Sequence, residues 1–362
     1  MTTVEERLLP SAEPVCLIDQ NGVPRDHSSY RLPTKAALLD GYAQLVRGRR
    51  FNDQASALVR QGRLAVYPSS FGQEACQVAA SMVLREGDWL FPTYRDSVSI
   101  VSRGVDPIET LTLLRGDWHS GYDPYEHKVA PQSTPLATQL PHAVGVAHAA
   151  RLKGEDTVVM ALVGDGGTSE GDFHEALNFA AVFHAPVVFF VQNNEYAISV
   201  PLAKQSAAPS LAHKGIGYGV PGERADGNDL AGLLAVLGQA VEKARAGEGP
   251  QLIEAHTYRV QAHTNADDAT RYREDDEVTP WLDRDPIQRL TTYLEHEGWL
   301  SSEVKENAEA QAVQVSAQLR EGLMPEPEVD PADLFAYLYA EQTQQTREQA
   351  AFLRDELARE EA

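Results

Sequence analysis

The 362-residue sequence has little cysteine, no long apolar run and too little positive charge for several functional classes. Its two cysteines, Cys16 and Cys76, cannot form a disulfide framework or a cysteine-rich metal site. No apolar run approaches the ~20 residues of a membrane-spanning helix, and the first residues lack the apolar segment of a signal peptide. Lysine and arginine number 31 against 53 acidic residues, a net charge of −22 that disfavours nucleic acid and anionic membranes as partners. We therefore expect a cytoplasmic protein.

The composition is that of an ordinary globular protein, since 43% hydrophobic and 23% charged residues exclude disordered, collagen-like and low-complexity chains. A chain of this length forms one large domain or two of ordinary size. Residues 1–30 are polar and interrupted by proline and glycine, as is typical of an N-terminal arm. We assign residues 31–300 to one α/β domain and residues 301–362, rich in Glu, Gln and Ala, to a helical C-terminal tail.

The centre of the chain alternates short apolar runs with helical periodicity. Residues 157–163 and 186–191 are continuously apolar and are predicted to be buried strands. Between them, Asp172 and Glu175 fit a helix N-cap and its partner three residues later. Strand, helix and strand within about 35 residues form a βαβ unit, so the fold class is α/β with a parallel sheet flanked by helices. Further elements are expected as helices at 34–62 and from 230 onward, and as a strand at 251–258.

Polar clusters follow both predicted strands. Asp165 stands among glycines after the first strand, and Asn194 stands in a run of polar residues after the second. Ligands of an open parallel sheet bind beyond the carboxyl ends of its strands, so the two side chains converge if the strands are neighbours. Carboxylate and amide oxygens suit magnesium or calcium and not zinc, and the glycines allow close backbone approach to an anion. A metal-bridged diphosphate is the expected occupant.

Two other phosphate-binding motifs fit less well. Gly164 and Gly166 match the first two glycines of a dinucleotide fingerprint, but Ser169 occupies the third position, and the next strand ends in 192–194 (Gln-Asn-Asn) rather than in an acid. A Walker Gly-Lys-Ser/Thr sequence is absent. Either polar cluster alone could equally be an ordinary turn, since Asn, Asp and Gly dominate turns. Their occurrence at successive strand ends favours a ligand site.

The segment from Gly164 to Asn194 resembles the thiamine-diphosphate motif. More specifically, residues 164–181 (GDGGTSEGDFHEALNFAA) resemble the alpha subunit of the decarboxylating component of 2-oxoacid dehydrogenase complexes. The resemblance extends from about Leu38 to Leu300 and includes further motifs at 72–75 (GQEA), 91–96 (FPTYRD), 133–139 (STPLATQ) and 263–273 (HTNADDATRYR). It implies a thiamine-diphosphate-binding fold.

The same resemblance implies which residues hold the cofactor. Magnesium on the diphosphate would be bound by the side chains of Asp165 and Asn194 and by the carbonyl of Tyr196. The other expected cofactor contacts are Tyr94, Arg95, His263, the backbone N–H groups of Gly166 and Gly167, and the backbone of Leu136. An arginine suits a diphosphate because its guanidinium grips phosphate oxygens bidentately.

A loop around residue 135 resembles the potassium site of the branched-chain subfamily. Its four expected ligands are Ser133, Pro135, Thr138 and Gln139. A capped helix start is an equally open interpretation of this loop.

Two histidines and two aromatic residues complete the predicted site. The resemblance places His263 and His119 at the mouth of the active site, where an imidazole suits proton transfer and stabilisation of a developing charge. Phe71 and Tyr94 are expected to line the substrate pocket, with core packing an equal alternative for Phe71. Gln192 departs from the arginine that some branched-chain relatives place before the Asn pair.

The activity implied is oxidative decarboxylation of a 2-oxoacid with thiamine diphosphate and transfer of the acyl group to the lipoyl arm of the acyltransferase core. The chain does not look long enough to hold a second, pyrimidine-binding domain, so the resemblance implies a beta subunit that supplies the activating glutamate in an α2β2 heterotetramer. The motifs at 133–139 and 258–263 favour a branched-chain 2-oxoacid. Pyruvate stays open as the substrate, as do an acetoin dehydrogenase alpha subunit, a non-catalytic scaffold and a nucleotide-binding regulator.

Overall fold

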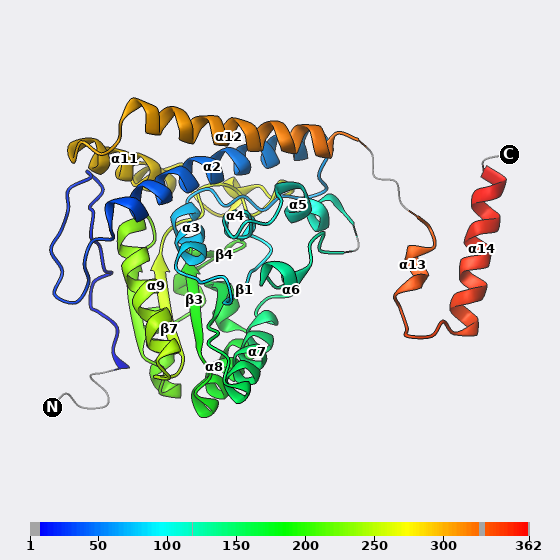
Figure 1. Ribbon diagram of the computed structural model, residues 1–362, viewed down its shortest axis with the longest axis horizontal. Coiled ribbons are helices and arrows are strands. Elements are labelled where there is room, and N and C mark those ends of the chain that lie inside the picture. The colour runs from blue at the N-terminus through cyan, green and yellow to red at the C-terminus, as the bar shows by residue number, and fades with distance from the viewer. Residues whose placement is uncertain (1–7, 118, 326–329, 361–362) are drawn as a thin grey trace. The chain divides into compact units, whose positions relative to one another are not determined.

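A computed structural model describes residues 8–117, 119–325 and 330–360 (Figure 1). The chain divides into two compact units, Met1–Gly322 and Leu323–Ala362. Residues 1–7 of the expected arm and residues 326–329 and 361–362 of the expected tail lie outside the described residues.

The first unit contains a five-stranded parallel sheet, which confirms the predicted fold class. The strands are, in spatial order, β1 (Trp89–Phe91), β2 (Val159–Gly164), β3 (Val187–Asn193), β7 (Gln251–His256) and β6 (Gly222–Asp226). Gly164 pairs with Gln192, and Asn193 pairs with His256, so the carboxyl ends of the three central strands lie at one edge of the sheet. A small antiparallel pair follows β3 and consists of β4 (Tyr196–Ala197) and β5 (Val200–Pro201).

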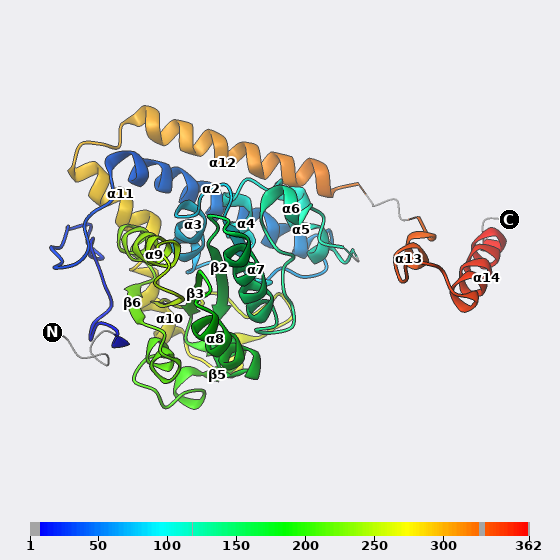
Figure 2. The same ribbon diagram turned by 60° about the horizontal axis from the view of Figure 1, so that its bottom comes forward.

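Helices cover both faces of this sheet, which explains why its central strands are continuously apolar. On one face, α7 (Gln139–Lys153) and α8 (Gly171–Phe183) lie side by side over β2 and β3 (Figures 1 and 2). Alternate strand residues point to this face and form a core with both helices: Val159, Ala161, Val163, Val187, Phe189 and Val191. The intervening strand residues point to the other face, where α9 (Leu230–Arg245) packs on β3, β6 and β7, and α3 (Glu74–Met82) packs on α9.

The remaining helices surround this core. They are α2 (Lys35–Arg60), α4 (Ser97–Ser102), α5 (Pro107–Arg115), α6 (Pro124–His127), α10 (Asp275–Leu282), α11 (Pro286–His296) and α12 (Ser302–Leu323), with 3₁₀ helices η1 (Gly166–Ser169), η2 (Leu202–Lys204), η3 (Leu211–Tyr218) and η4 (Ala269–Arg271). The predicted helix at 34–62 is α2, and the hydroxyl of Thr34 caps it by accepting the N–H of Ala37.

The helix at the start of the expected tail belongs to the first unit. Figures 1 and 2 show α12 running alongside α2, and Ser316 Oγ donates to Gln54 Oε1 at 2.8 Å. Gln318 Nε2 also donates to Asp106 Oδ2 at 2.6 Å. The second unit contains α13 (Asp333–Ala336) and α14 (Gln344–Glu360). No helix within the described ranges has both the length and the apolar character needed to cross a bilayer.

Two local expectations differ from the structure. The N-terminal segment is part of the core, because Val15, Leu17 and Ile18 are each 1% exposed and Val15 pairs with Ala225 beside β6. This pairing covers an edge strand whose N–H and C=O groups would otherwise lack partners. Helix α8 begins at Gly171 with Glu170 at the N-cap, so Asp172 lies in its first turn and is not the N-cap. The reason is that residues 166–169 form η1, which leads directly into the helix.

Candidate active site

A cavity of about 470 Å³ lies at the carboxyl ends of β2 and β3. Most of the residues predicted from the sequence line it: Tyr94, Arg95, Ser133, Leu136, Gln139, Asp165, Gly166, Gly167, Asn194, Tyr196 and His263. They come from loops that are far apart in the sequence and follow β1, β2, β3 and β7. The parallel sheet brings these loops together because every strand ends at the same edge.

Asp165 and Asn194 meet in this cavity. The N–H of Asn194 lies 3.4 Å from Asp165 Oδ1, and the two residues are 1% and 6% exposed. The Asn194 amide nitrogen donates to Gln73 Oε1 at 2.9 Å, and its oxygen accepts the N–H of Tyr196 at 3.3 Å. The two strand ends are therefore neighbours, as the sequence predicts.

Asp165 is a buried carboxylate that no salt bridge within the described residues neutralises, although the charge of Lys214 acts on it from a longer distance. No Lys, Arg or His of the described chain forms an ion pair with it, and its side-chain hydrogen bond comes from Gln205 Nε2 at 2.7 Å. Burial raises the pKa of Asp165 above its usual range. Gln205 Oε1, on the same amide, is buried without a hydrogen-bond partner. A cation with a hydration shell would compensate both groups, because a buried charge or acceptor without a partner is destabilising.

The carbonyl of Tyr196 is held by an arginine. Arg259 is 1% exposed, and its Nη1 donates to Tyr196 O at 3.3 Å while its Nη2 donates to Ile198 O at 2.6 Å. A carbonyl oxygen has two lone pairs, so this hydrogen bond leaves one for a second partner.

The two glycines after Asp165 bring the backbone close to its neighbours. A Cβ atom at Gly166 would lie 2.7 Å from the Cβ of Ala197, and one at Gly167 would lie 2.6 Å from Val163 Cγ2. Within the described chain, neither glycine N–H donates a backbone hydrogen bond, whereas Thr168 N already donates to Asp165 O at 3.0 Å. Two donors near a buried carboxylate are thus available to a ligand.

Arg95 and His263 form the opposite part of the cavity. Arg95 Nη2 lies 3.0 Å from His263 Nδ1 and donates to His263 O at 3.0 Å, while Nη1 donates to Ser69 O at 2.9 Å. The ring of Tyr94 packs edge-on against the imidazole with 6.0 Å between centroids. Burial and the charges of Arg95 and Arg259 lower the pKa of His263 to about 4. The imidazole is therefore neutral at pH 7.

Oxygen atoms converge in the loop around residue 135. Ser133 Oγ donates to Pro135 O at 2.8 Å and lies at hydrogen-bond distance, 3.0 Å, from Thr138 Oγ1, which donates to Pro135 O at 3.1 Å. Gln139 Nε2 donates to Leu162 O at 2.7 Å, and its Oε1 is buried without a hydrogen-bond partner. The helix N-cap, Thr138, makes no side-chain capping bond, so the alternative of a capped helix start is wrong.

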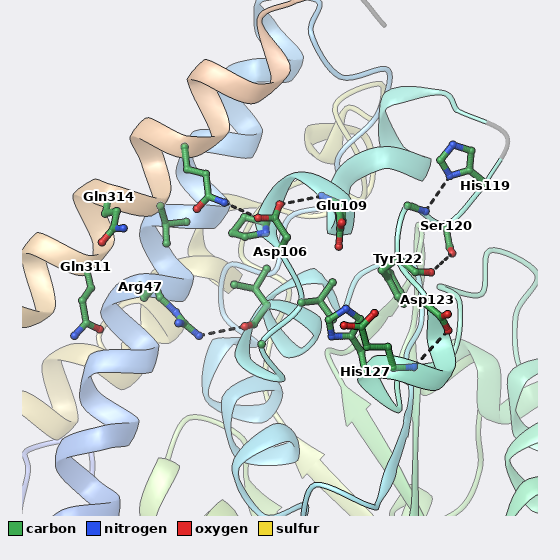
Figure 3. A pocket seen from close by; sticks show the side chains of 18 residues that line it. Arg47, Asp106, Glu109, His119, Ser120, Tyr122, Asp123, His127, Gln311 and Gln314 are labelled. Atoms are coloured by element: carbon green, nitrogen blue, oxygen red, sulfur yellow. Dashed lines mark hydrogen bonds between the residues drawn. The ribbon is translucent and has the colours of Figure 1, made fainter. Parts of the chain in front are cut away.

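Two predicted site residues lie outside the cavity. His119 lines a separate cavity of about 910 Å³ together with Asp123 and His127, where its Nδ1 accepts the N–H of Gly121 at 3.1 Å (Figure 3). Helices α2, α5 and α12 border that second cavity, so the structure does not bring His119 to His263. The guanidinium carbon of Arg49 lies 4.3 Å from the centroid of the Phe71 ring. Phe71 is not among the described residues that line the first cavity.

Residues 43–321 match the family model described as the dehydrogenase E1 component. The chain is 47% identical over 348 residues to the 3-methyl-2-oxobutanoate dehydrogenase subunit alpha of Mycobacterium tuberculosis (strain ATCC 25618 / H37Rv), covering 96% of this chain and 95% of the relative. It is 37% identical over 335 residues to the pyruvate dehydrogenase E1 component subunit alpha of Acholeplasma laidlawii, covering 91% of this chain and 96% of the relative. The corresponding subunit of Staphylococcus aureus (strain N315) is 36% identical over 339 residues, with 93% and 91% covered. The chain belongs to the dehydrogenase E1 component family.

Dehydrogenase E1 components depend on thiamine diphosphate, so the family agrees with a diphosphate site at the glycine-rich edge of the sheet. Three residues that hold others in this E1 site were not predicted from the sequence: Gln73, Arg259 and Gln205. Each acts by holding another site residue, and their positions in the chain show no spacing that relates them to it. The motifs at 72–75 and 258–263 contain Gln73 and Arg259, but neither motif indicates the partner of its residue.

Proposed function

We propose that this chain is the alpha subunit of a 2-oxoacid dehydrogenase E1 component that decarboxylates a branched-chain 2-oxoacid and transfers the acyl group to the lipoyl arm of an acyltransferase component. The buried Asp165 carboxylate facing Asn194, which forms no salt bridge within the described residues, supports a metal-bound diphosphate more directly than any other feature. The 47% identity to a subunit named for 3-methyl-2-oxobutanoate favours the branched-chain substrate.

We propose that thiamine diphosphate binds with Mg²⁺ on the Asp165 and Asn194 side chains and the carbonyl of Tyr196. The residues fit this group because a carboxylate, an amide and a carbonyl are the hard oxygen donors that Mg²⁺ prefers. Within the described residues no group of three or more His, Cys, Asp or Glu side chains is placed to hold a metal ion, and Asp165 is the one charged residue of the proposed set. When bound, the cofactor supplies a nucleophilic carbon that adds to the 2-oxo group and accepts the electrons released with carbon dioxide.

The remaining cofactor contacts hold the anionic end. Gly166 and Gly167 offer free N–H groups, and Arg95 offers a guanidinium that two carbonyls fix in place. A rigid guanidinium binds phosphate oxygens with little further loss of side-chain freedom. Tyr94 adds a phenol at the cavity wall, and Leu136 contributes its backbone on the aminopyrimidine side.

His263 is proposed to act as a neutral hydrogen-bond donor. Since Arg95 occupies Nδ1, the proton lies on Nε2, which can donate to an oxygen that gains negative charge during decarboxylation or acyl transfer. Tyr94 packs on this ring and is proposed to contact the substrate. The catalytic role of His119 and the substrate role of Phe71 stay predictions.

We also propose a potassium site at Ser133, Pro135, Thr138 and Gln139. The hydroxyls of Ser133 and Thr138 and the carbonyl of Pro135 meet through hydrogen bonds of 2.8–3.1 Å, and Gln139 Oε1 is buried without a partner, so this loop offers four oxygen atoms to a monovalent cation. Such an ion would fix the loop that carries Leu136 into the cavity.

A beta subunit is the proposed partner, in an α2β2 heterotetramer. Within the described part of the first unit no glutamate is placed as the base that cofactor activation requires: of the residues lining the cavity, Glu170 is the one glutamate, and it lies at the N-cap of α8 beside the phosphate-binding turn. The partner would supply that carboxylate.

The free thiols of Cys16 and Cys76 support a cytoplasmic location.

Pyruvate is the second candidate substrate, because relatives at 36–37% identity are pyruvate dehydrogenase subunits. The test is to co-express the chain with a beta subunit of the same family and to measure reduction of an artificial electron acceptor with 3-methyl-2-oxobutanoate, pyruvate and acetoin. We expect the highest kcat/KM with 3-methyl-2-oxobutanoate. A preference for pyruvate would reassign the substrate, and no turnover with any of the three would reject the enzymatic function.

A further inference from the structure

Four polar side chains in the wall of the cavity form a continuous row of hydrogen bonds. Asp96 Oδ1 accepts from Gln192 Nε2 at 2.7 Å, Gln192 Oε1 accepts from Gln73 Nε2 at 3.0 Å, and Gln73 Oε1 accepts from Asn194 Nδ2 at 2.9 Å. The four come from three separate loops and one strand, and all are at least nine-tenths buried: Asp96 is 0% exposed, Gln192 2%, Gln73 3% and Asn194 6%.

We propose that Asp96, Gln192 and Gln73 are positioning residues for the cation site, because together they determine which end of the Asn194 amide faces the cation. The proposal rests on the proposed cofactor site and extends it to residues outside the proposed set of metal ligands. We refer to these three residues as the amide relay.

The direction of the relay is set by the carboxylate at its far end. An ionised carboxylate can only accept hydrogen bonds, whereas an amide has one accepting end and one donating end. Asp96 Oδ2 already accepts the N–H and the hydroxyl of Thr93 at 2.7 and 2.6 Å. Burial raises the pKa of Asp96, while these bonds, the one from Gln192 and the charge of Arg95 favour its ionised form. With three donors directed at it, Asp96 acts as an acceptor, and Gln192 must present its nitrogen to it.

The same rule then applies at each following step. Gln192 presents its oxygen to Gln73, so Gln73 presents its nitrogen to Gln192 and its oxygen to Asn194. Asn194 in turn presents Nδ2 to Gln73. This leaves Oδ1, whose hydrogen bond from Tyr196 N is long at 3.3 Å, as its free group in the cavity. Turning one amide over would place donor against donor at a buried contact, which is costly.

The relay matters because an asparagine is a metal ligand through its oxygen alone. If Asn194 turned over, an NH₂ group would face the cation and a water molecule would replace the lost ligand. Outer-shell partners of metal ligands typically affect metal affinity by roughly 10–100-fold. In this chain Gln192 thus connects Asp96 to Gln73, at a position where some branched-chain relatives have an arginine.

Asp96→Asn tests the relay with a change of almost no volume. The amide introduced at this position can still accept from Thr93 through its oxygen, but its nitrogen then faces Gln192 and favours the opposite orientation of every following amide. We expect the affinity for Mn²⁺ at saturating thiamine diphosphate, measured by electron paramagnetic resonance on the complex with the beta subunit, to fall by roughly 10-fold or more. We also expect one additional water on the bound Mn²⁺, counted by line broadening in H₂¹⁷O.

Asp96→Asn/Gln192→Glu is the rescue variant. A carboxylate at position 192 accepts both from the amide introduced at position 96 and from Gln73, so the original direction is restored from Gln73 onward. We expect Mn²⁺ affinity to return to within about 3-fold of the wild type, and hydration to return to the wild-type number of waters. Asp88→Asn is the matched control, since Asp88 is also 0% exposed but lies at the opposite end of the sheet, where it pairs with Arg245. It is expected to lower the melting temperature without changing Mn²⁺ binding.

The outcomes separate the relay from the site that it serves. If Asp96→Asn weakens binding without adding a water, or if the double variant does not recover, the relay is rejected while the cation site stands. If the wild type does not bind Mn²⁺ with thiamine diphosphate, or if Asp165→Ala binds it equally well, the cation site itself is rejected. Should Asp96→Asn fail to fold, Gln192→Met interrupts the relay without changing the charge, and unchanged hydration in that variant would overturn the proposal.

Discussion

The Nη2 atom of Arg95 lies 3.0 Å from Nδ1 of His263. A guanidinium has no accepting atom and does not lose its proton in proteins, so Nδ1 must be the unprotonated nitrogen of the ring. Arg259 Nη1 approaches the same atom at 3.4 Å. Two buried arginines thus set both the charge and the tautomer of His263. Among the described residues it is the one histidine that lines the cavity.

The first prediction concerns the charge of His263. Burial and the two arginines lower its pKa from 6.5 to about 4, so the neutral ring, protonated on Nε2, should persist from about pH 8 down to about pH 5. Because the unfolded chain binds this proton near pH 6.5, His263 destabilises the folded state progressively as the pH falls from about 6.5 to 4. ¹⁵N spectra of histidine-labelled protein, assigned with His263→Asn, would show no titration of this ring near pH 6.5. A midpoint near 6.5 would contradict the assignment.

The second prediction concerns catalysis by the same residue. His263→Ala should fold normally with the beta subunit but lose about 10²–10⁴-fold in kcat, the usual range for a positioned donor or proton carrier. His296→Ala is the control, since its side chain is 78% exposed and lies on α11. Steady-state rates at saturating 2-oxoacid would measure the effect. Full activity of His263→Ala would remove its catalytic role.

The third prediction tests the proposed cation ligand. Asp165→Asn keeps an oxygen that can accept the hydrogen bond from Gln205, but it removes the negative charge that attracts Mg²⁺. We expect calorimetry with thiamine diphosphate and Mg²⁺ to show affinity reduced by at least about 100-fold, in line with the strong energetic effect of removing one partner of a buried charge pair. Glu175→Gln, an exposed acid on α8, should bind normally. Equal affinity in both variants would argue against the ligand set.

The fourth prediction concerns the potassium loop. Replacing K⁺ by choline should lower the melting temperature of the wild type, because an ion that binds the folded loop and not the unfolded chain stabilises the folded state. Thr138→Val removes one of the proposed ligand oxygens with little change of volume, and its melting temperature should respond little to K⁺. Differential scanning fluorimetry in matched ionic strength measures both. An identical K⁺ response in the variant would exclude Thr138 as a ligand.

The fifth prediction concerns a glycine beside the cavity. Gly72 has φ +98° and a Cβ there would lie 2.2 Å from Tyr258 O, whereas Gly62 has φ +71° with nothing within 4 Å. An L-residue in this region of φ costs about 1–2 kcal/mol. Gly72→Ala should therefore lower the free energy of unfolding by clearly more than Gly62→Ala, because it adds a clash with the backbone that leads to Arg259. Urea denaturation of both variants would show whether this difference exists.

Local patterns predicted the central elements well, and the failures have a common cause. Apolar runs located β2 and β3 to within two residues, since a strand buried on both faces must be apolar throughout. The N-terminal segment looked like a polar arm because its few apolar residues are scattered among polar ones, yet Val15, Leu17 and Ile18 fill the edge beside β6. Whether a short segment pairs with an edge strand depends on residues far away in the sequence, here those of β6, and local composition carries no information about them.

By itself, the sequence determined the α/β fold class, the pairing of Asp165 with Asn194 and the family, because each follows from residue types at short spacing. The tertiary structure alone decided that Arg95 contacts His263 and helps to keep it uncharged, that hydrogen bonds link Asp96 to Asn194 through two amides, and that His119 lines another cavity. These relationships join loops separated by up to 168 positions in the chain. Distances between such loops are set by how helices and strands pack, and packing depends on the whole set of buried side chains at once.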